Sequence, residues 1–584
     1  MNEQHPDSQS PLSPQEKKAW EGPFPPGPHL FDWLSSALFI GLAVVILMTF
    51  MDYGLSWDEP EQVRYGKLIL DFFSSGFSDR GAIEVWPNLS LRGGLFDTPV
   101  QFLASLSSWG DFGVRRLAIP LTGFVGIVGC WRMARLVGGA QAAFWAALFL
   151  ILTPSYYGHM FINSSDIPYA AAMIWALYYL SRLLAALPHI PTHLSVKFGL
   201  TLGAALGVRI GGVLVIGYSG LLGLFYLGRW LQNRLPRREI IKRTRHLALH
   251  LLLSFTIAYL VMIAFWPKAL LDPLRVPLET ILFMSRFPWP GDVLFNGRFT
   301  PSGELPWNYL PLYFSIKLPE CLLFFLGLAI PISWGRIQQA RLTGSGEHIL
   351  AFSLLWMAIT IPLAYVLIAR PVLYDGLRHF IFLMPPMAVL AGVAVTASLA
   401  RLRKRSQRAG IWGVILLVIA LASLTRVMVG LHPYQYVYFN TLVGGVQGAS
   451  GRFERDYWAT AYREAVIKMA EHAREEARVR GIDFENHTYR VTVCGPLISA
   501  SHFLPENFIS EPRLNHSDYF LGFTRWNCNR PGSGQIATAV TREGAILAVI
   551  KKIPQRALQD HVGSTTGDQS TITSLDHPPP PPAH

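Results

Sequence analysis

The chain has 584 residues, of which 51% are hydrophobic and only 15% are charged, and its mean hydropathy is +0.30. These values exclude a single water-soluble core and indicate a polytopic membrane protein. The formal net charge of +12 is expected from basic loops beside anionic lipid, so nucleic acid is not expected as a partner.

The two ends of the chain are polar and rich in proline. Residues 1–33 are expected to form a disordered cytoplasmic tail, and residues 561–584, with five consecutive prolines, a second disordered tail. No small-residue cleavage site follows a short apolar core near the start. The first apolar segment is therefore interpreted as an uncleaved anchor.

Apolar segments recur along residues 34–430, which we predict to be the transmembrane domain. Residues 198–228 are too long for one crossing and are expected to form a hairpin that turns near Arg209. Nine further segments of roughly 18–23 residues can each cross ~30 Å of hydrocarbon, so we predict about eleven transmembrane helices. These nine lie near 34–51, 116–135, 139–156, 166–186, 247–266, 311–334, 348–369, 379–400 and 411–430.

Basic residues gather in loops that we expect on the cytoplasmic side of the membrane. The largest group lies between Arg229 and Arg245, and another lies between Arg401 and Arg408. With these loops inside, the amino terminus is also inside and the carboxyl terminus is outside. Three large segments then face outward, namely residues 52–115, 267–310 and 431–560.

Residues 431–560 are expected to form a small extracytoplasmic α/β domain. A helical pattern covers 461–477, and β-prone runs cover 489–494, 519–523 and 545–550. No metal cluster or nucleophile motif stands out there, so the domain is interpreted as a lid or a platform for the acceptor. Cys494 and Cys528 are expected either to form a disulfide in an oxidising compartment or to remain two separate buried thiols.

Three carboxylates lie at the predicted outer surface. Asp58 and Glu59 follow the first span in the segment YGLSWDEP, and Asp166 opens the fourth span in GHMFINSSDIP. Acids beside lipid are costly, which suggests chemistry. The alternatives are that Asp166 caps its helix and that the acid pair is an exposed turn before a proline.

Cations lie on the same predicted surface, where they suit a phosphate ligand. Arg378 and His379 are the strongest candidates because they share a short turn with Asp375. Taken singly, such a cation is more often an interfacial snorkelling residue, and Arg209 is explained equally well by helix packing and by contact with a donor headgroup. The other candidates are Lys268, Arg298 and Lys317.

Carboxylates beside a cationic patch suit the transfer of a sugar from a lipid phosphate. A carboxylate can take the proton of the acceptor hydroxyl as that hydroxyl attacks the anomeric carbon. Arg, Lys or a divalent metal can stabilise the leaving polyprenyl phosphate, and a single displacement inverts the anomeric centre. Asp58 and Asp166 would be the ligands of any Mg²⁺ or Mn²⁺, but the carboxylates alone do not require a metal.

The order of these features resembles the integral-membrane glycosyltransferases of the GT-C fold. This group includes protein O-mannosyltransferases and lipid A aminoarabinose transferases, and the motifs resemble a bacterial, family-39-like branch. Beside the two acidic motifs, the resemblance rests on LGVRIGG (206–212), LPWNYLP (305–311), IKLPE (316–320), LRHF (377–380), HPYQYVYFN (432–440) and DYW (456–458).

The resemblance implies a hexosyl- or pentosyltransferase of the bacterial inner membrane that uses a polyprenyl-phosphate sugar. Its acceptor would be a protein, a lipid or a polysaccharide. Asp58 would be the catalytic base, with Glu59 next in line, and Asp166 would orient the acceptor or help hold a metal. Ser164 and Ser165 depart from the family pattern, which often has a basic residue before the second Asp.

Two other classes of protein remain as alternatives. A transporter or a flippase for lipid-linked sugars would favour broken helices and charges at the membrane midplane. Here the charged residues gather at one surface, and the spans do not form two matching halves. A non-catalytic assembly protein would require the acid pair to be incidental.

Overall fold

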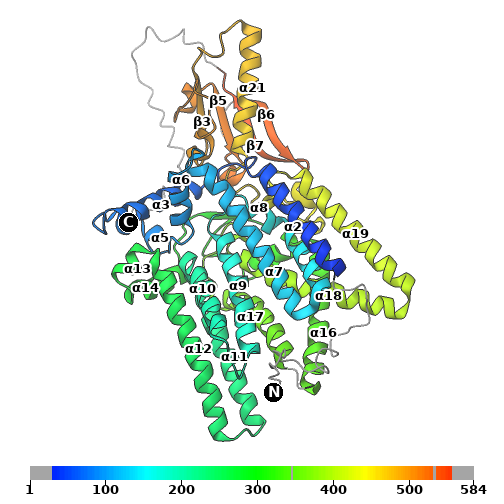
Figure 1. The fold of residues 1–584 in the computed structure, drawn as a ribbon. Helices are drawn as coiled ribbons and strands as arrows, with labels where there is room; N and C mark the ends of the chain where they lie inside the picture. Colours follow the sequence, from blue (N-terminus) through cyan, green and yellow to red (C-terminus); the bar gives the residue numbers. More distant parts are fainter. Residues whose placement is uncertain (1–28, 344–345, 531–533, 555–584) are drawn as a thin grey trace, which may run out of the picture.

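The computed structural model in Figure 1 describes residues 29–343, 346–530 and 534–554. The two predicted tails lie outside these residues, except that helix α2 begins at His29, earlier than the first span was expected to start. The long helices are α2 (His29–Thr49), α7 (Gly110–Ile151), α9 (Asp166–Ala185), α10 (Thr192–Val208), α11 (Val213–Gln232), α12 (Arg237–Ala264), α16 (Glu320–Thr343), α17 (Gly346–Ala369), α18 (Met384–Arg405) and α19 (Gln407–Gly430).

The described residues include nine helical segments that are long and apolar enough to cross a membrane. Two observations reconcile this number with the predicted eleven. Helix α7 breaks at Gly139, where φ is 78°, a conformation that favours glycine. Helix α10 has 17 residues and is joined to α11 through a short 3₁₀ turn, η1 (Ile210–Gly212), as the hairpin prediction required. The polytopic α-helical fold is thus confirmed.

One predicted span is displaced. The segment expected at 311–334 is divided into α15 (Tyr309–Lys317) and α16, with Leu318 extended at φ −89° and ψ 144° between them. Pro319 causes the break, because it has no amide hydrogen to donate and it disfavours the helical conformation of the residue before it.

The first two of the three segments that were predicted to face outward contain regular structure and are not open loops. Residues 52–115 fold into helices that lie against the bundle end, and residues 267–310 fold into two short helices and an antiparallel hairpin that pairs Asp292 with Pro301. These elements are α3 (Glu59–Ser74), α4 (Gly81–Glu84), α5 (Pro87–Ser90), α6 (Asp97–Ser105), α13 (Pro267–Leu271), α14 (Arg275–Ser285), β1 (Asp292–Phe295) and β2 (Arg298–Pro301).

The C-terminal region is a small α/β domain, as predicted. Its five-stranded sheet has the order β4-β3-β5-β7-β6; β3 runs parallel to β4 and β5, and the pairs β5–β7 and β6–β7 are antiparallel. Strands β4 and β6 had not been expected. The elements are α21 (Tyr462–Arg480), β3 (Tyr489–Val493), α22 (Leu497–Ser501), β4 (Phe508–Ser510), η5 (Leu514–His516), β5 (Tyr519–Phe523), η6 (Arg525–Asn527), β6 (Gln535–Arg542) and β7 (Ala545–Lys552).

This sheet and α21 lie at one end of the helical bundle, whereas the turn between α11 and α12 lies at the opposite end (Figure 1). Several short elements complete the fold. They are α8 (Pro154–His159), η2 (Arg378–Leu383), η3 (Gln435–Val437), η4 (Thr441–Val443) and α20 (Gly445–Gly448).

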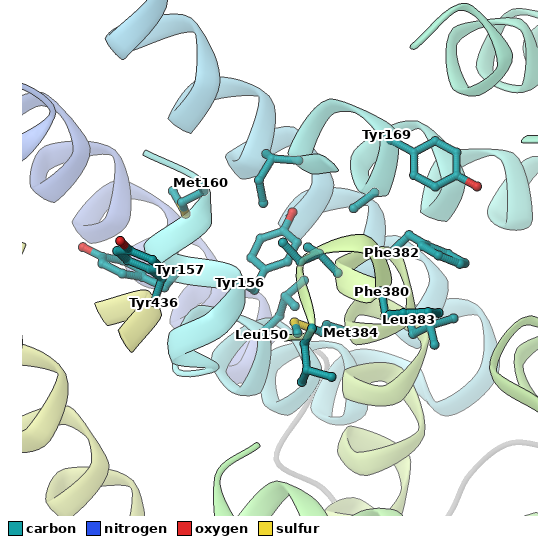
Figure 2. Packing of buried hydrophobic residues seen from close by; sticks show 14 of the residues in the cluster. Leu150, Tyr156, Tyr157, Met160, Tyr169, Phe380, Phe382, Leu383, Met384 and Tyr436 are labelled. Atoms are coloured by element: carbon teal, nitrogen blue, oxygen red, sulfur yellow. The ribbon is translucent and has the colours of Figure 1, made fainter. Parts of the chain in front are cut away.

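The core of the bundle is dense and aromatic. Figure 2 shows Tyr156 and Tyr169 near the turn that carries Phe380 and Phe382. Tyr156 is fully buried, and its hydroxyl donates a hydrogen bond to the Gly123 carbonyl at 3.0 Å. The Tyr156 hydrogen bond joins α8 to α7, and a ring contact between Tyr169 and Phe382 joins α9 to η2, so the packing connects the elements that carry charged residues.

Candidate active site

The carboxylate of Asp58 meets a cation from a distant part of the chain. Asp58 directly precedes α3, yet its side chain makes no capping bond to that helix. Its Oδ2 instead accepts a hydrogen bond from Arg378 Nη1 at 2.9 Å. The Asp58 side chain remains 43% exposed, so this carboxylate is accessible to a substrate.

Asp166 lies beside the same guanidinium and is buried. Its Oδ2 is 3.8 Å from Arg378 Nε, and its Oδ1 is 2.7 Å from Arg209 Nη2. The backbone amide at the start of α9 is bonded by another side chain: Asn163 Oδ1 accepts a hydrogen bond from the Asp166 amide at 2.8 Å. Helix capping therefore does not explain the Asp166 carboxylate.

Arg378 connects these acids with a third, Asp375. Arg378 Nη1 lies 3.0 Å from Asp375 Oδ2, and Arg378 Nη2 lies 3.2 Å from His379 Nε2. The rings of Tyr374 and Trp458 lie 5.3 and 5.1 Å from the Arg378 guanidinium, within the range of cation–π contacts. Arg378 and His379 thus lie beside the acids, and their predicted role as phosphate ligands stays a prediction.

Glu59 does not belong to the acid cluster, although it adjoins Asp58 in the sequence. Its residue is 2% exposed, and among the described residues its Oε1 has no hydrogen-bond partner. Burial raises the pKa of Glu59 to about 7, while Arg116 and Arg115 act in the opposite direction. This carboxyl is therefore harder to ionise than an exposed glutamate.

Arg92 was missed by the sequence analysis. Its Nη1 lies 3.5 Å from the Ser165 hydroxyl, next to Asp166, and its buried Nε has no partner among the described residues. Burial lowers the pKa of Arg92; nearby Asp97 raises it, and nearby Arg209 lowers it further. Arg92 and Arg209 thus place two like charges in one neighbourhood.

A glycine explains how these two arginines come together. A Cβ on Gly93 would lie 2.1 Å from the Gly207 carbonyl oxygen, so only glycine allows the segment before α6 to pass this close to the end of α10. The Leu95 amide donates to the same carbonyl at 3.3 Å. The LRGG run at 91–94 was the sequence signal for this close approach.

An apolar cavity of about 270 Å³ opens beside the arginines. Its wall includes Pro168, two residues after Asp166, and Val208, which directly precedes Arg209. Helices α7, α9 and α10 supply most of the wall, and one Thr side chain from each of α7 and α10 interrupts an otherwise apolar surface. The complete lining is Leu95, Phe96, Thr122, Val125, Pro168, Ala171, Ala172, Trp175, Thr201, Ala204 and Val208.

Three predicted phosphate ligands lie elsewhere. Lys317 is 3% exposed, and its Nζ donates to the Tyr436 and Tyr438 carbonyls, both at 2.9 Å. Arg298 is exposed on β2, and Lys268 is half-buried in α13. Among the described residues, none of the three cations forms an ion pair with the acid cluster.

The acids also offer little to a divalent metal. Such a cation needs several oxygen ligands, whereas Asp58 and Asp166 are both already paired with guanidinium groups. In the part of the chain that the structure describes, no group of three or more His, Cys, Asp or Glu residues could hold a metal ion. The residues present therefore do not fit a metal.

The C-terminal domain also reaches the cluster. Arg525 Nη2 lies 2.8 Å from Asp375 Oδ1, and the Trp526 ring packs edge-to-face on Trp57 with 5.4 Å between centroids. Cys494 and Cys528 are joined in a disulfide. Of the two alternatives for these cysteines, the structure thus contains the disulfide.

Comparison with solved structures finds similar chains at low sequence identity. One is ArnT from Cupriavidus metallidurans bound to undecaprenyl phosphate, with a TM-score of 0.48 and 15% identity over 89% of this chain and 98% of that chain. A second is the archaeal oligosaccharyltransferase AglB from Archaeoglobus fulgidus in complex with an inhibitory peptide and a dolichol-phosphate, with a TM-score of 0.46 and 13% identity over 82% of this chain and 65% of that chain.

A third is the arabinofuranosyltransferase AftD from Mycobacteria. Its TM-score is 0.40, and the identity is 13% over 89% of this chain and 40% of that chain. The sequence matches no protein-family model and no curated protein.

Proposed function

We propose that this protein is a membrane glycosyltransferase that moves a sugar from a polyprenyl phosphate to an acceptor hydroxyl, with inversion at the anomeric carbon. The observation that carries the proposal is the position of the accessible Asp58 carboxylate. It lies in one charged site with Arg92 and Arg209, which adjoin an apolar groove. A carboxylate, a cationic site and a lipid groove are the parts that this reaction needs.

Arg92 and Arg209 would bind the donor phosphate. Arg209 Nη2 is paired with Asp166. Among the described residues, the buried Nε atoms of Arg209 and Arg92 have no hydrogen-bond partner. Two guanidinium groups with unused donors suit the oxygens of a phosphate. The apolar cavity, whose wall includes Val208 and Pro168, would hold the first isoprene units of the tail.

Asp58 would act as the base. Only its Oδ2 is bonded within the described residues, so Oδ1 can accept the proton of the acceptor hydroxyl. The acceptor oxygen forms a bond to the anomeric carbon as the bond from that carbon to the phosphate oxygen breaks. The polyprenyl phosphate leaves with that electron pair, stabilised by the two arginines, and Asp58 later releases the proton to water.

The distribution of basic loops supports an extracytoplasmic site. The α11–α12 turn, which carries Arg234 and is followed by Arg237 at the start of α12, lies at the bundle end away from the sheet (Figure 1). By the positive-inside tendency that end is cytoplasmic, so the acids and the sheet domain face outward. The disulfide supports the same orientation because disulfides persist in oxidising compartments. We assign the protein to a bacterial inner membrane on these grounds and on the sequence resemblance.

The acceptor class remains a protein, a lipid or a polysaccharide hydroxyl. A transporter or a flippase for lipid-linked sugars is less well supported, since the charged cluster lies beside the sheet domain, at one end of the bundle.

The exchange Asp58→Asn tests the proposed function. Envelope glycans, lipids and proteins would be compared by mass spectrometry between cells with the wild-type chain and cells with the variant. One missing sugar in the variant would identify donor and acceptor together. The matched control is Asp71→Asn, at an exposed carboxylate on α3, the helix that Asp58 precedes. Wild-type glycosylation by an Asp58→Asn protein of normal abundance would refute the role of Asp58 as base.

A further inference from the structure

Arg525 links the C-terminal domain to the charged site of the bundle. Its Nη2 lies 2.8 Å from Asp375 Oδ1, and its Nε lies 3.3 Å from Glu454 Oε1. All three side chains are at most 4% exposed. Because buried charges are costly unless they are paired, the Asp375 carboxylate needs its cationic partners, and Arg525 is one of them.

The other oxygen of Asp375 continues this chain of contacts towards the base. Asp375 Oδ2 lies 3.0 Å from Arg378 Nη1, and the same nitrogen lies 2.9 Å from Asp58 Oδ2. Asp375 and Asp58 therefore share one donor atom. If Arg525 were absent, Asp375 would draw the Arg378 guanidinium more strongly and weaken its contact with Asp58.

The backbone around Asp375 is held in an uncommon conformation. Asp375 and Gly376 have φ values of 57° and 61°, and the Gly376 amide donates to the Tyr309 hydroxyl at 3.1 Å. A non-glycine residue at positive φ is found mainly where the surrounding structure holds it, often at functional sites. The side chain of Asp375 therefore points to a fixed position, and its two partners must fit that position.

The segment that carries Arg525 is itself fixed at several points. Cys528 is bonded to Cys494, at the end of β3, and the two Cα atoms are 5.7 Å apart. Arg525 Nη1 donates to the Tyr457 carbonyl at 3.0 Å, and Trp526 Nε1 donates to the Asp292 carbonyl at 3.3 Å.

Trp526 also contacts Trp57, the residue before Asp58, through an edge-to-face ring contact. The segment 525–528 therefore contacts both Asp375, which shares Arg378 with Asp58, and Trp57, which precedes Asp58.

We infer that Arg525 is a positioning residue, which keeps Arg378 on Asp58 by neutralising Asp375, and that the Cys494–Cys528 disulfide holds Arg525 in place. This inference rests on the proposed function and deepens it. The C-terminal domain completes the active site, and sugar transfer requires the oxidised chain.

The first test uses the full-length protein, purified in detergent and assayed with the lipid-linked sugar identified through Asp58→Asn. Arg525→Met should lower kcat on the order of 10- to 100-fold, because small displacements of reacting groups have effects of this size, with little change in KM for the donor. Arg525→Lys should restore part of the rate, since it returns the charge to Asp375. Binding of undecaprenyl phosphate alone should stay unchanged in both variants.

Arg542→Met is the matched control. Arg542 lies in the same domain, pairs with Glu464 at 2.6 Å and reaches the His432 carbonyl at 2.9 Å, without contact to the acid cluster. It should transfer sugar at the wild-type rate.

A double-mutant cycle separates positioning from general support of the fold. If Arg525 acts through Asp375, then Arg525→Met should have little further effect on kcat in an Asp375→Asn background. Cys528→Ser, and the wild-type chain treated with dithiothreitol, should lose transfer to a similar degree. Additive effects of Arg525→Met and Asp375→Asn on kcat would overturn the inference. Full activity of the reduced wild-type chain would overturn it as well.

The two proposals fail in different ways. An inactive wild-type protein that still binds undecaprenyl phosphate would refute the proposed function. An active Arg525→Met protein would refute only the positioning role. If Arg525→Met does not accumulate in the membrane, Arg525→Lys and Cys528→Ser test the inference in its place. A wild-type kcat in both variants would refute the role of Arg525. A lower kcat in both, with unchanged KM, would support it.

Discussion

Arg378 Nη1 lies 2.9 Å from Asp58 Oδ2, although 320 positions separate the two residues in the chain. Arg378 is also close to Asp166 and Asp375, so one guanidinium serves three carboxylates. The charges of all three carboxylates are therefore compensated in part by this one guanidinium.

Replacement of Arg378 should therefore destabilise the protein as well as inactivate it. Arg378→Met would leave several acids without their shared partner, and loss of one member of a buried ionic group typically costs about 3–5 kcal/mol. Thermal unfolding in detergent measures this loss. The control is Arg370→Met, at an exposed arginine between α17 and η2. An unchanged Tm for Arg378→Met would contradict the assigned contacts.

Arg92 and Arg209 are expected to bind the phosphate of the donor and of the lipid product. Each charge-assisted hydrogen bond is worth roughly 1.5–3 kcal/mol, so Arg92→Met or Arg209→Met should weaken undecaprenyl phosphate binding by about 10- to 100-fold. Isothermal titration with the purified protein provides the measurement. Arg64→Met, at a 60% exposed arginine of α3, serves as the control. Equal affinity of all three variants would mean that the phosphate binds elsewhere.

The apolar groove should recognise the lipid tail. Ala172→Trp would fill it next to Pro168, and overpacking of this kind costs about 1–3 kcal/mol. We expect weaker binding of undecaprenyl phosphate but normal binding of a short-chain prenyl phosphate. Leu221→Trp, on an exposed part of α11, is the matched substitution. Equal losses for long and short chains would indicate general damage and not a tail site.

Glu59 should make stability depend on pH. Its pKa rises on folding from 4.5 to about 7, so the folded state binds the proton more tightly than the unfolded state does. The contribution of Glu59 to stability is therefore most favourable below pH 4.5 and is lost as the pH rises towards 7. Glu59→Gln should remove this loss and stabilise the protein at pH 8 by as much as ~3 kcal/mol.

The measurement is the difference in thermal stability between wild type and Glu59→Gln across pH 5–8. Glu304→Gln, at an exposed site, controls for the removal of one charge. A difference that does not change with pH would show that Glu59 is ionised in the folded protein.

The sequence was a good guide to those site residues that lie close to a helix end. Asp58 and Asp166 each adjoin a predicted span, and Arg378 lies in a short turn between two spans, so topology alone brought them to one surface. Their pairing could not be derived, because it depends on segments more than a hundred residues apart. The assignment of roles to these residues stays a prediction.

Glu59 shows a signal that was present but not used. Successive helical residues differ by about 100° around the axis, so Asp58 and Glu59 cannot face the same way. Glu59 is in register with Val63, Gly66 and Ile69, which are buried along α3. The helical period therefore indicated that Glu59 points into the protein and Asp58 does not.

Lys317 marks the opposite case, where the local sequence carried no usable signal. A lysine near a span can bind phosphate or fold inwards, and the choice depends on the groups that surround it. Here the acceptors are main-chain carbonyls about 120 positions later in the chain. Main-chain carbonyls have no side-chain signature, so this contact could not have been predicted.

The Lys317 contact also bears on how the protein unfolds. Its buried amino group belongs to the bundle, while both of its acceptors belong to the segment that leads into the sheet domain. Separation of the bundle from the sheet domain would leave the Lys317 amino group and the two main-chain carbonyls without these hydrogen bonds, which is costly for buried polar groups. We therefore expect bundle and sheet domain to melt in a single transition, and a fragment that starts at residue 431 to be a poor substitute for the domain within the whole chain.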